Sequence, residues 1–246
     1  MASTGDNMCV VRKGEAVSAN LEKVVPWGRS LAEYVRMFDL SAADLESRIL
    51  DCGGGPASVN AEMHRLGHKL VSCDPIYEFS AADIAGRIDE TSHAILKNAE
   101  ENRDNFVWTE MKSPEHVVEI RMAAMKQFLD DFPLGLAQGR YVVAELPVLP
   151  FPDREFDLAL CSHFLFTYSH LFDLQFHLDS VRELCRVARE ARIFPLLPNF
   201  GEAHSPLVSP LVGQLTAEGY RCELKRVPYE FQKGGNEMLR VSRSRL

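Results

Sequence analysis

The sequence lacks several features that mark whole classes of protein. No apolar run reaches the roughly 18 residues that a membrane-spanning helix needs, and residues 1–20 lack the apolar stretch of a signal peptide. There is no C-x-x-C pair, and the six cysteines stand far apart, at Cys9, Cys52, Cys73, Cys161, Cys185 and Cys222. This scatter predicts neither a metal site nor a disulfide framework. We therefore expect a cytoplasmic protein that does not enter a membrane.

Basic residues are also scarce relative to acidic ones. The chain has 27 lysines and arginines against 35 aspartates and glutamates, a formal net charge of −8. An acidic surface repels phosphate backbones, so we expect no nucleic-acid partner. The 246 residues, 46% of them hydrophobic, suffice for one large α/β domain or for a domain with a small cap. We expect a monomer or a homodimer.

A glycine-rich stretch at residues 48–57 stands out within this ordinary composition. Ile49 and Leu50 suit a short buried strand, Asp51 ends it, and three glycines lead to a possible helix over 58–66. Strand, glycine turn and helix form the opening unit of nucleotide-binding α/β domains, where glycine lets the backbone approach a ligand closely. A carboxylate there suits an ammonium group better than a pyrophosphate. The same run could also be a tight turn without a ligand.

The spacing Asp51-x-Gly53-x-Gly55-x-Ala57 resembles the first motif, D-x-G-x-G-x-G, of Rossmann-like, class I S-adenosylmethionine-dependent methyltransferases. Ala57 replaces the third glycine. The resemblance covers about residues 48–246 and implies S-adenosylmethionine as cofactor, with its methionine part against Asp51, Gly53 and Gly55. It also implies an α/β fold with a seven-stranded, mostly parallel sheet and a C-terminal antiparallel hairpin.

The pattern of apolar segments predicts where the elements of this fold lie. We expect strands at 49–50, 69–73, 141–144, 156–161 and 192–197, and a closing hairpin of 220–227 and 238–241 joined by a glycine turn. Helices are expected at 58–66, 81–87, 90–102, 114–132, 174–190 and 207–218. Residues 1–47 are predicted to form an N-terminal helical lid segment, with Ser30 and Ser41 as helix caps. Residues 48–246 form the main domain, with a helical insert at 80–138 that covers the sheet.

Two acids lie where the nucleoside part of a cofactor would be held. Asp74 ends the second predicted strand, close to the spacing of about 20 residues at which an acid meets a ribose. It could also simply cap the next helix. In the resembling family the residue after this acid, here Pro75, often flanks the adenine. The Leu149-Pro-Phe stretch resembles a family segment preceded by an acid that binds the adenine amine, which places Glu145 and Leu146 there.

The end of the fourth predicted strand is where the reacting groups are expected. Backbone groups near Cys161 would lie against the methionine part, and His163 and Tyr168 are the polar groups most suited to face the sulfur. A histidine there could accept the acceptor's proton, or could merely be a hydrogen-bonded part of the lining. The residues expected to contact the acceptor are Trp27, Arg29, Tyr34 and Phe166.

Taken together, these features predict an enzyme that transfers a methyl group from S-adenosylmethionine to a small molecule. Three alternatives stay open. The protein could bind the cofactor without turnover, as a regulator. It could be an NAD-dependent oxidoreductase, although the missing third glycine and the closing hairpin speak against this. It could also methylate RNA or protein.

Overall fold

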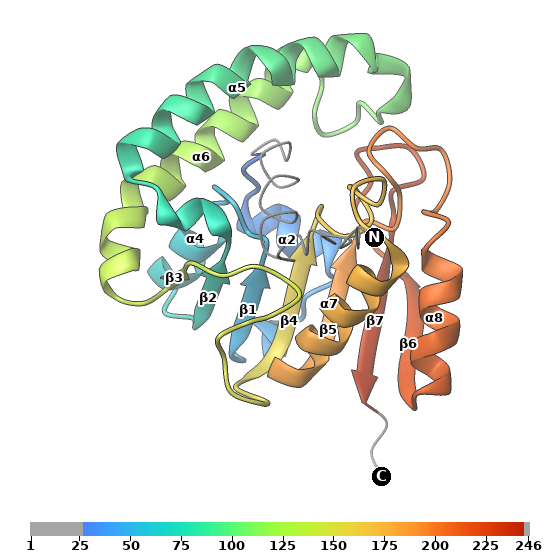
Figure 1. Ribbon diagram of the computed structural model, residues 1–246. Coiled ribbons are helices and arrows are strands. Elements are labelled where there is room, and N and C mark those ends of the chain that lie inside the picture. The colour runs from blue at the N-terminus through green and yellow to red at the C-terminus, as the bar shows by residue number, and fades with distance from the viewer. Residues whose placement is uncertain (1–26, 244–246) are drawn as a thin grey trace, which may run out of the picture.

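A seven-stranded sheet runs through the protein, with helices packed on both of its faces (Figure 1). In this computed structural model, which describes residues 27–243 apart from the side chains of 91–94, the strand order is β3-β2-β1-β4-β5-β7-β6. The strands are β1 (Ile49–Cys52), β2 (Leu70–Cys73), β3 (Tyr141–Val142), β4 (Phe156–Ser162), β5 (Ala188–Phe194), β6 (Tyr220–Arg226) and β7 (Glu237–Arg243). Only β7 pairs antiparallel with its neighbours. The predicted fold class is therefore confirmed.

The helices lie where the direction of the chain through the sheet requires them. They are α2 (Leu31–Met37), α3 (Ala42–Leu45), α4 (Val59–Arg65), α5 (Ala81–Glu101), α6 (Pro114–Ala137), α7 (Leu174–Val187) and α8 (Val208–Ala217), with the short 3₁₀ helices η1 (Pro75–Glu78) and η2 (Arg103–Asn105). The chain passes from β1 to β2 in one direction and from β4 to β5 in the other. Right-handed crossovers then place α4 and α7 on opposite faces.

Two capping boxes begin the helices before the first strand, as the sequence predicts. The Ser30 side chain accepts from the backbone N–H of Glu33, whose carboxylate accepts in turn from the backbone of Ser30. Ser41 and Asp44 make the same exchange at the start of α3. Such caps satisfy backbone donors that a helix start leaves unpaired. The predicted lid also includes residues 1–26, which lie outside the described residues, as does Cys9.

The insert consists of two long helices that run side by side over one end of the sheet (Figure 1). The sequence predicts separate helices at 81–87 and 90–102, but α5 is continuous from Ala81 to Glu101. No proline or glycine stands at the predicted break between residues 87 and 90, and the helix continues through Gly86. The insert therefore forms a single arm of two helices, α5 and α6.

Two boundaries near the end of the chain differ from the prediction. Helix α7 ends at Val187, and Ala188 already has extended backbone (φ −126°, ψ 163°), so β5 begins without a loop. Strand β5 ends at Phe194 because Pro195 has no N–H to donate. The hairpin is confirmed, but residues 227–236, a longer connection than the predicted glycine turn, join its strands. No helix within 27–243 is long and apolar enough to cross a membrane.

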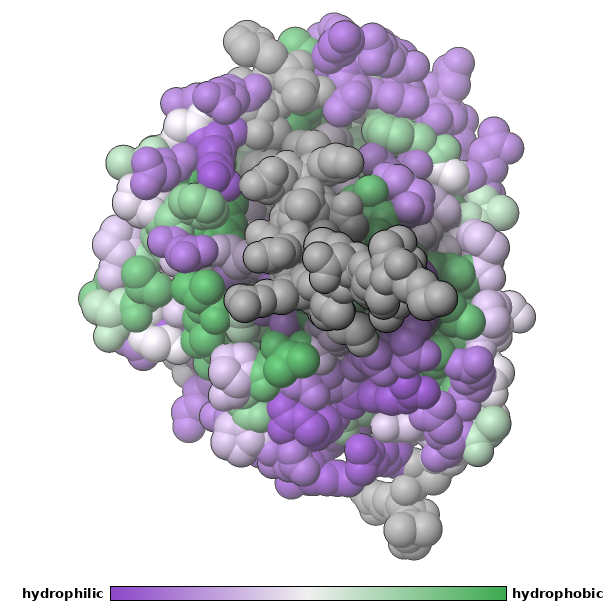
Figure 2. Space-filling view, in the orientation of Figure 1, coloured by the Kyte–Doolittle hydropathy of each residue, from purple (hydrophilic) through white to green (hydrophobic). Residues whose placement is uncertain are grey.

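Hydrophilic side chains cover much of the outer surface. Figure 2 shows them along the insert at the top of the view and over the lower part of the molecule, with hydrophobic residues gathered at the left. The exposed large apolar side chains include Leu66, Leu134 and Leu136. The main apolar core lies inside, where β1, β4 and β5 pack against α7 and α8.

Candidate functional site

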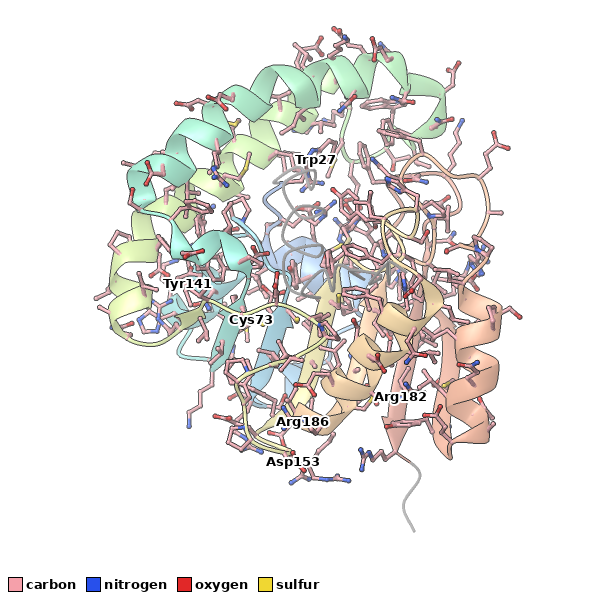
Figure 3. The ribbon with its side chains drawn as sticks, viewed as in Figure 1. Trp27, Cys73, Tyr141, Asp153, Arg182 and Arg186 are labelled. Atoms are coloured by element: carbon pink, nitrogen blue, oxygen red, sulfur yellow. The ribbon has the colours of Figure 1, made fainter. Side chains whose placement is uncertain are left out.

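A cavity of about 910 Å³ opens at the carboxyl ends of the parallel strands. Its walls come from the segment before α2, the turns after β1, β2 and β4, the insert, and the 227–236 connection. Figure 3 shows Trp27, one of the lining residues, between the helical insert and the sheet. The volume is near the top of the range of roughly 300–1,000 Å³ for small-molecule sites, and this edge is where open α/β sheets bind ligands.

The three glycines after β1 form one wall of the cavity, and each is required by the local geometry. Gly53 and Gly55 have positive φ (70° and 52°), which favours glycine. A Cβ on Gly54 would collide with the Asp51 carboxylate. The Gly53 amide donates to the Cys73 carbonyl of β2 at 2.8 Å, which fixes the turn to the sheet. The turn thus exposes bare backbone to the cavity.

Asp51 supports this turn from below and does not itself line the cavity, unlike the prediction. Its side chain is buried, with one oxygen accepting from the Tyr34 hydroxyl at 2.9 Å and the other from Ser72 Oγ at 3.1 Å. Burial raises the pKa of Asp51 to about 7, although both hydrogen bonds oppose the rise. The tyrosine, whose hydroxyl is bonded to this acid, lines the cavity instead. The reason is that Asp51 lies within β1, not after it.

The predicted nucleoside-binding residues come together on the neighbouring wall. Asp74, Pro75, Glu145 and Leu146 all line the cavity. Asp74 also caps η1, because its oxygens accept from the backbone N–H groups of Ile76 and Gly55, both at 2.9 Å. Asp74 can therefore cap the next helix and still face a ligand in the cavity. Burial raises the pKa of Asp74 to about 6, and burial also raises the pKa of Glu145.

Of the residues predicted to meet the cofactor or the acceptor at the end of β4, only some line the cavity. His163 and Tyr168 line the cavity, and His163 has a positive φ of 49°. Its Nδ1 lies 2.9 Å from Ser162 Oγ. Burial, followed by the charges of Arg29 and Arg121, lowers the pKa of His163 well below its usual value. These surroundings therefore favour the neutral form of the imidazole.

Two residues predicted at this site are not exposed to the cavity. Cys161 and Phe166 are fully buried and belong to the main core. The ring of Phe166 packs against that of His177 on α7, with centroids 5.6 Å apart. Side chains alternate along a strand, and the next residue, Ser162, lines the cavity, so the expectation that backbone groups near Cys161 meet the cofactor stays a prediction. The prediction of Phe166 as an acceptor contact is therefore wrong.

One side of the cavity is lined by aromatic residues that the sequence did not predict. Phe106 from the insert and Phe231 from the 227–236 connection stack with centroids 4.4 Å apart, and Phe200 packs edge-on to Phe106. All three line the cavity. Two backbone hydrogen bonds join the same segments, from Val107 to Phe231 at 2.7 Å and from Lys233 to Asn105 at 2.9 Å. No local sequence signal shows that segments so far apart in the chain meet.

Buried charges lie behind the predicted acceptor residues Trp27, Arg29 and Tyr34, which all line the cavity. Arg121 of α6 has no exposed side-chain surface, and its Nη1 donates to the Glu33 carboxylate at 2.7 Å. The Tyr229 hydroxyl donates to the other Glu33 oxygen at 3.0 Å. Figure 3 shows the surface pair Asp153 and Arg186 at the opposite end of the sheet.

Comparison with known proteins places the chain in a family. No family model matches it. The uncharacterized protein MJ0045 of Methanocaldococcus jannaschii is 33% identical over 225 residues, which are 91% of this chain and 98% of that protein. The chain belongs to the same family as MJ0045. The match spans nearly the whole of both chains, so it extends over the segments on both sides of the cavity.

Solved structures with a similar arrangement are more distant in sequence. Magnesium protoporphyrin IX methyltransferase (ChlM) from Synechocystis PCC 6803 with bound SAM has 13% identity and a TM-score of 0.44, over 99% of this chain and 87% of that one. A putative RNA methyltransferase from Pyrococcus horikoshii has 12% identity and a TM-score of 0.43, over 95% and 100% of the two chains. The fold itself is established here by the strand order and the reversed β7.

Proposed function

We propose that the protein is a methyltransferase that uses S-adenosylmethionine and acts on a small-molecule acceptor. The observation that carries the proposal is the meeting of three features in one cavity: the bare glycine turn, the strand-end acid Asp74, and Glu145 with Leu146. When bound, S-adenosylmethionine supplies a methyl group on a positively charged sulfur. The residues present fit such a cofactor, because Gly53 and Gly55, whose positive φ favours glycine, leave the backbone of the turn bare toward the cavity.

Each wall would hold a different part of the cofactor. Asp74 would accept hydrogen bonds from the ribose hydroxyls, since each of its oxygens accepts one backbone bond and keeps a lone pair. Glu145 and Leu146 would border the adenine. The acids Asp74 and Glu145 line this side of the cavity, which favours a cationic ligand and disfavours the diphosphate of NAD.

His163 is better suited to orient the acceptor than to take up its proton as a general base. Its low pKa means that the imidazolium form is strongly disfavoured beside Arg29 and Arg121. A neutral ring nitrogen can still accept a hydrogen bond from the acceptor and orient it. Holding the reacting atoms in line can supply much of the rate of a displacement. The residues around the transferred group would then act mainly by positioning.

Calorimetry with S-adenosylhomocysteine and NAD⁺ tests the cofactor assignment. We expect the wild-type protein to bind one S-adenosylhomocysteine per chain and to show no NAD⁺ binding. Asp74→Asn keeps the shape of the side chain but removes its charge, and should weaken S-adenosylhomocysteine by about 10- to 100-fold, as loss of charge-assisted hydrogen bonds of roughly 1.5–3 kcal/mol implies.

The matched control is Asp153→Asn, an exposed acid at the opposite end of the sheet, which should leave the affinity unchanged. Tight binding of NAD⁺ alone would reject the proposal, and an unchanged affinity in Asp74→Asn would reject the ribose assignment. Release of S-adenosylhomocysteine from S-adenosylmethionine, in the presence of a pool of small metabolites, then distinguishes an enzyme from a binding protein.

A further inference from the structure

One cation in the cavity wall has no counter-ion. Arg29 lines the cavity, and its only hydrogen bond to the described residues runs from Nη1 to the Trp27 carbonyl at 3.3 Å. Its Nε is buried and has no partner in the described part of the chain. A guanidinium has five N–H donors, and a buried charge without an anion is costly. We infer that Arg29 anchors a carboxylate on a molecule bound in this cavity.

The nearest acid, Glu33, makes no hydrogen bond with Arg29 among the described residues and is already bonded to three other groups. Glu33 accepts from Arg121 at 2.7 Å and from the Ser30 amide at 3.0 Å with one oxygen, and from the Tyr229 hydroxyl with the other. Arg29 and Arg121 therefore share one carboxylate, which leaves an excess of one positive charge within this group of three side chains. The neutral state of His163 does not change that balance.

A second unpaired polar group lines the same cavity. Thr167 is 7% exposed, and its Oγ1 is buried without a hydrogen-bond partner within residues 27–243. Buried polar side chains are almost always hydrogen-bonded. Two unsatisfied groups in one lining indicate that a polar ligand completes this site, and Arg29 gives that ligand its sign.

The charge of the surrounding wall favours a carboxylate over a phosphate. Asp74 and Glu145 line the same cavity and would repel a doubly charged anion. A carboxylate carries one charge and matches the planar fork of a guanidinium in two parallel hydrogen bonds. This inference rests on the proposed function, and it admits two sources: the amino-acid end of the cofactor, or an acidic acceptor beside the aromatic rings of Phe106 and Phe231.

Arg29→Met tests the inference with a pair of ligands that differ only in the amino-acid end. S-Adenosylhomocysteine carries the carboxylate, and 5′-methylthioadenosine lacks the whole amino-acid part. If the cofactor supplies the carboxylate, Arg29→Met weakens S-adenosylhomocysteine by about 10- to 100-fold in calorimetry and leaves 5′-methylthioadenosine unchanged. Arg29→Lys, which keeps the charge without the fork, should fall between the variant and the wild type.

A second pair of probes tests the acceptor as the source. On protein saturated with S-adenosylhomocysteine, 4-hydroxybenzoate and 4-hydroxybenzyl alcohol differ in one carboxylate. If the acceptor supplies the carboxylate, Arg29→Met leaves the affinities for both nucleosides unchanged. It weakens the binding of 4-hydroxybenzoate at least 10-fold relative to that of 4-hydroxybenzyl alcohol. Arg221→Met, an exposed arginine of β6 outside the cavity lining, is the matched control and should change none of the four affinities.

The inference is overturned if no affinity depends on Arg29, or if both members of each pair fall equally. Because Arg29 has one weak internal hydrogen bond and an unpaired charge, the melting temperature of ligand-free Arg29→Met should be no lower than that of the wild type, which checks folding. Failure of the proposed function looks different: wild-type protein then binds neither nucleoside. The benzoate pair on ligand-free protein would still decide the role of Arg29.

Discussion

At the scale of single residues, the main feature is the burial of two carboxyl groups, which raises their pKa values. Burial raises the pKa of Asp51 to about 7 and that of Asp74 to about 6, from an ordinary value of 3.8. Such an acid holds its proton more tightly in the folded state than in the unfolded state. Its contribution to stability is therefore fully present below pH 3.8 and is lost as the pH rises through the folded pKa.

The ligand-free protein should accordingly lose stability between pH 5 and pH 8. Asp51→Asn should remove much of that loss, on the order of 1–3 kcal/mol, because the amide can still meet Tyr34 and Ser72 but does not titrate. Urea unfolding at pH 5, 6.5 and 8 measures the effect. Asp153→Asn, whose acid is largely exposed, is the control. Parallel pH profiles for the wild type and Asp51→Asn would show that Asp51 does not titrate in this range.

At the scale of elements, one buried group of residues ties together three segments around the cavity. Glu33 comes from α2, Arg121 from α6 and Tyr229 from the 227–236 connection, and all three side chains are buried. Arg121 also donates to the Gly28 carbonyl at 3.1 Å. The group therefore fixes the helical insert and the C-terminal connection to the segment that carries Arg29.

Breaking this group from one side should be strongly destabilising. Glu33→Gln leaves the Arg121 charge buried without an anion, and we expect a loss of about 3–5 kcal/mol in the free energy of unfolding. The double variant Glu33→Met with Arg121→Met should recover most of that loss, since neither charge is then buried.

Denaturant unfolding of all three proteins measures both effects. The exposed pair Lys126 and Asp130 provides the control, and Asp130→Asn should change the stability by less than about 1 kcal/mol. A double variant no more stable than Glu33→Gln would show that shape, not charge, sets the cost.

Local sequence signals were sufficient to predict most helices and strands, and also the part of the site formed by the glycine turn and the acid after β2. Caps at Ser30 and Ser41, the glycine turn and the acid after β2 are each written in a few adjacent residues. The direction of side chains along β4 is not, because both faces of this strand are buried and no apolar–polar alternation marks the cavity side. The sequence therefore could not show that Cys161 faces the core and Ser162 the cavity.

Contacts between distant segments could not be predicted at all. Phe106 and Phe231, or Glu33 and Arg121, meet only because the insert folds back over the sheet (Figure 1). Each is an unremarkable residue in its own segment. The unpaired state of Arg29 was likewise hidden, since it depends on which acids the fold has already used.

For the whole molecule, the charge balance bears on the kind of acceptor. The net charge is −8, and Arg29 and Arg87 are the cationic side chains among the described residues that line the cavity. Proteins that hold nucleic acid present many lysines and arginines to the phosphates. The cavity instead combines aromatic rings with acids, which suits a small organic acceptor.

We therefore expect transfer RNA and single-stranded oligonucleotides to bind more weakly than about 10⁻⁴ M at 150 mM salt, the weak limit of ordinary non-specific binding. Fluorescence anisotropy at 50 and 200 mM salt measures this, with a basic RNA-binding protein as positive control. The affinity should hardly change with salt, because few counter-ions are released when few phosphates are neutralised. Micromolar binding that falls about 10³-fold or more over this range would require a basic surface in contact with the phosphates, and RNA would then replace a small molecule as the proposed acceptor.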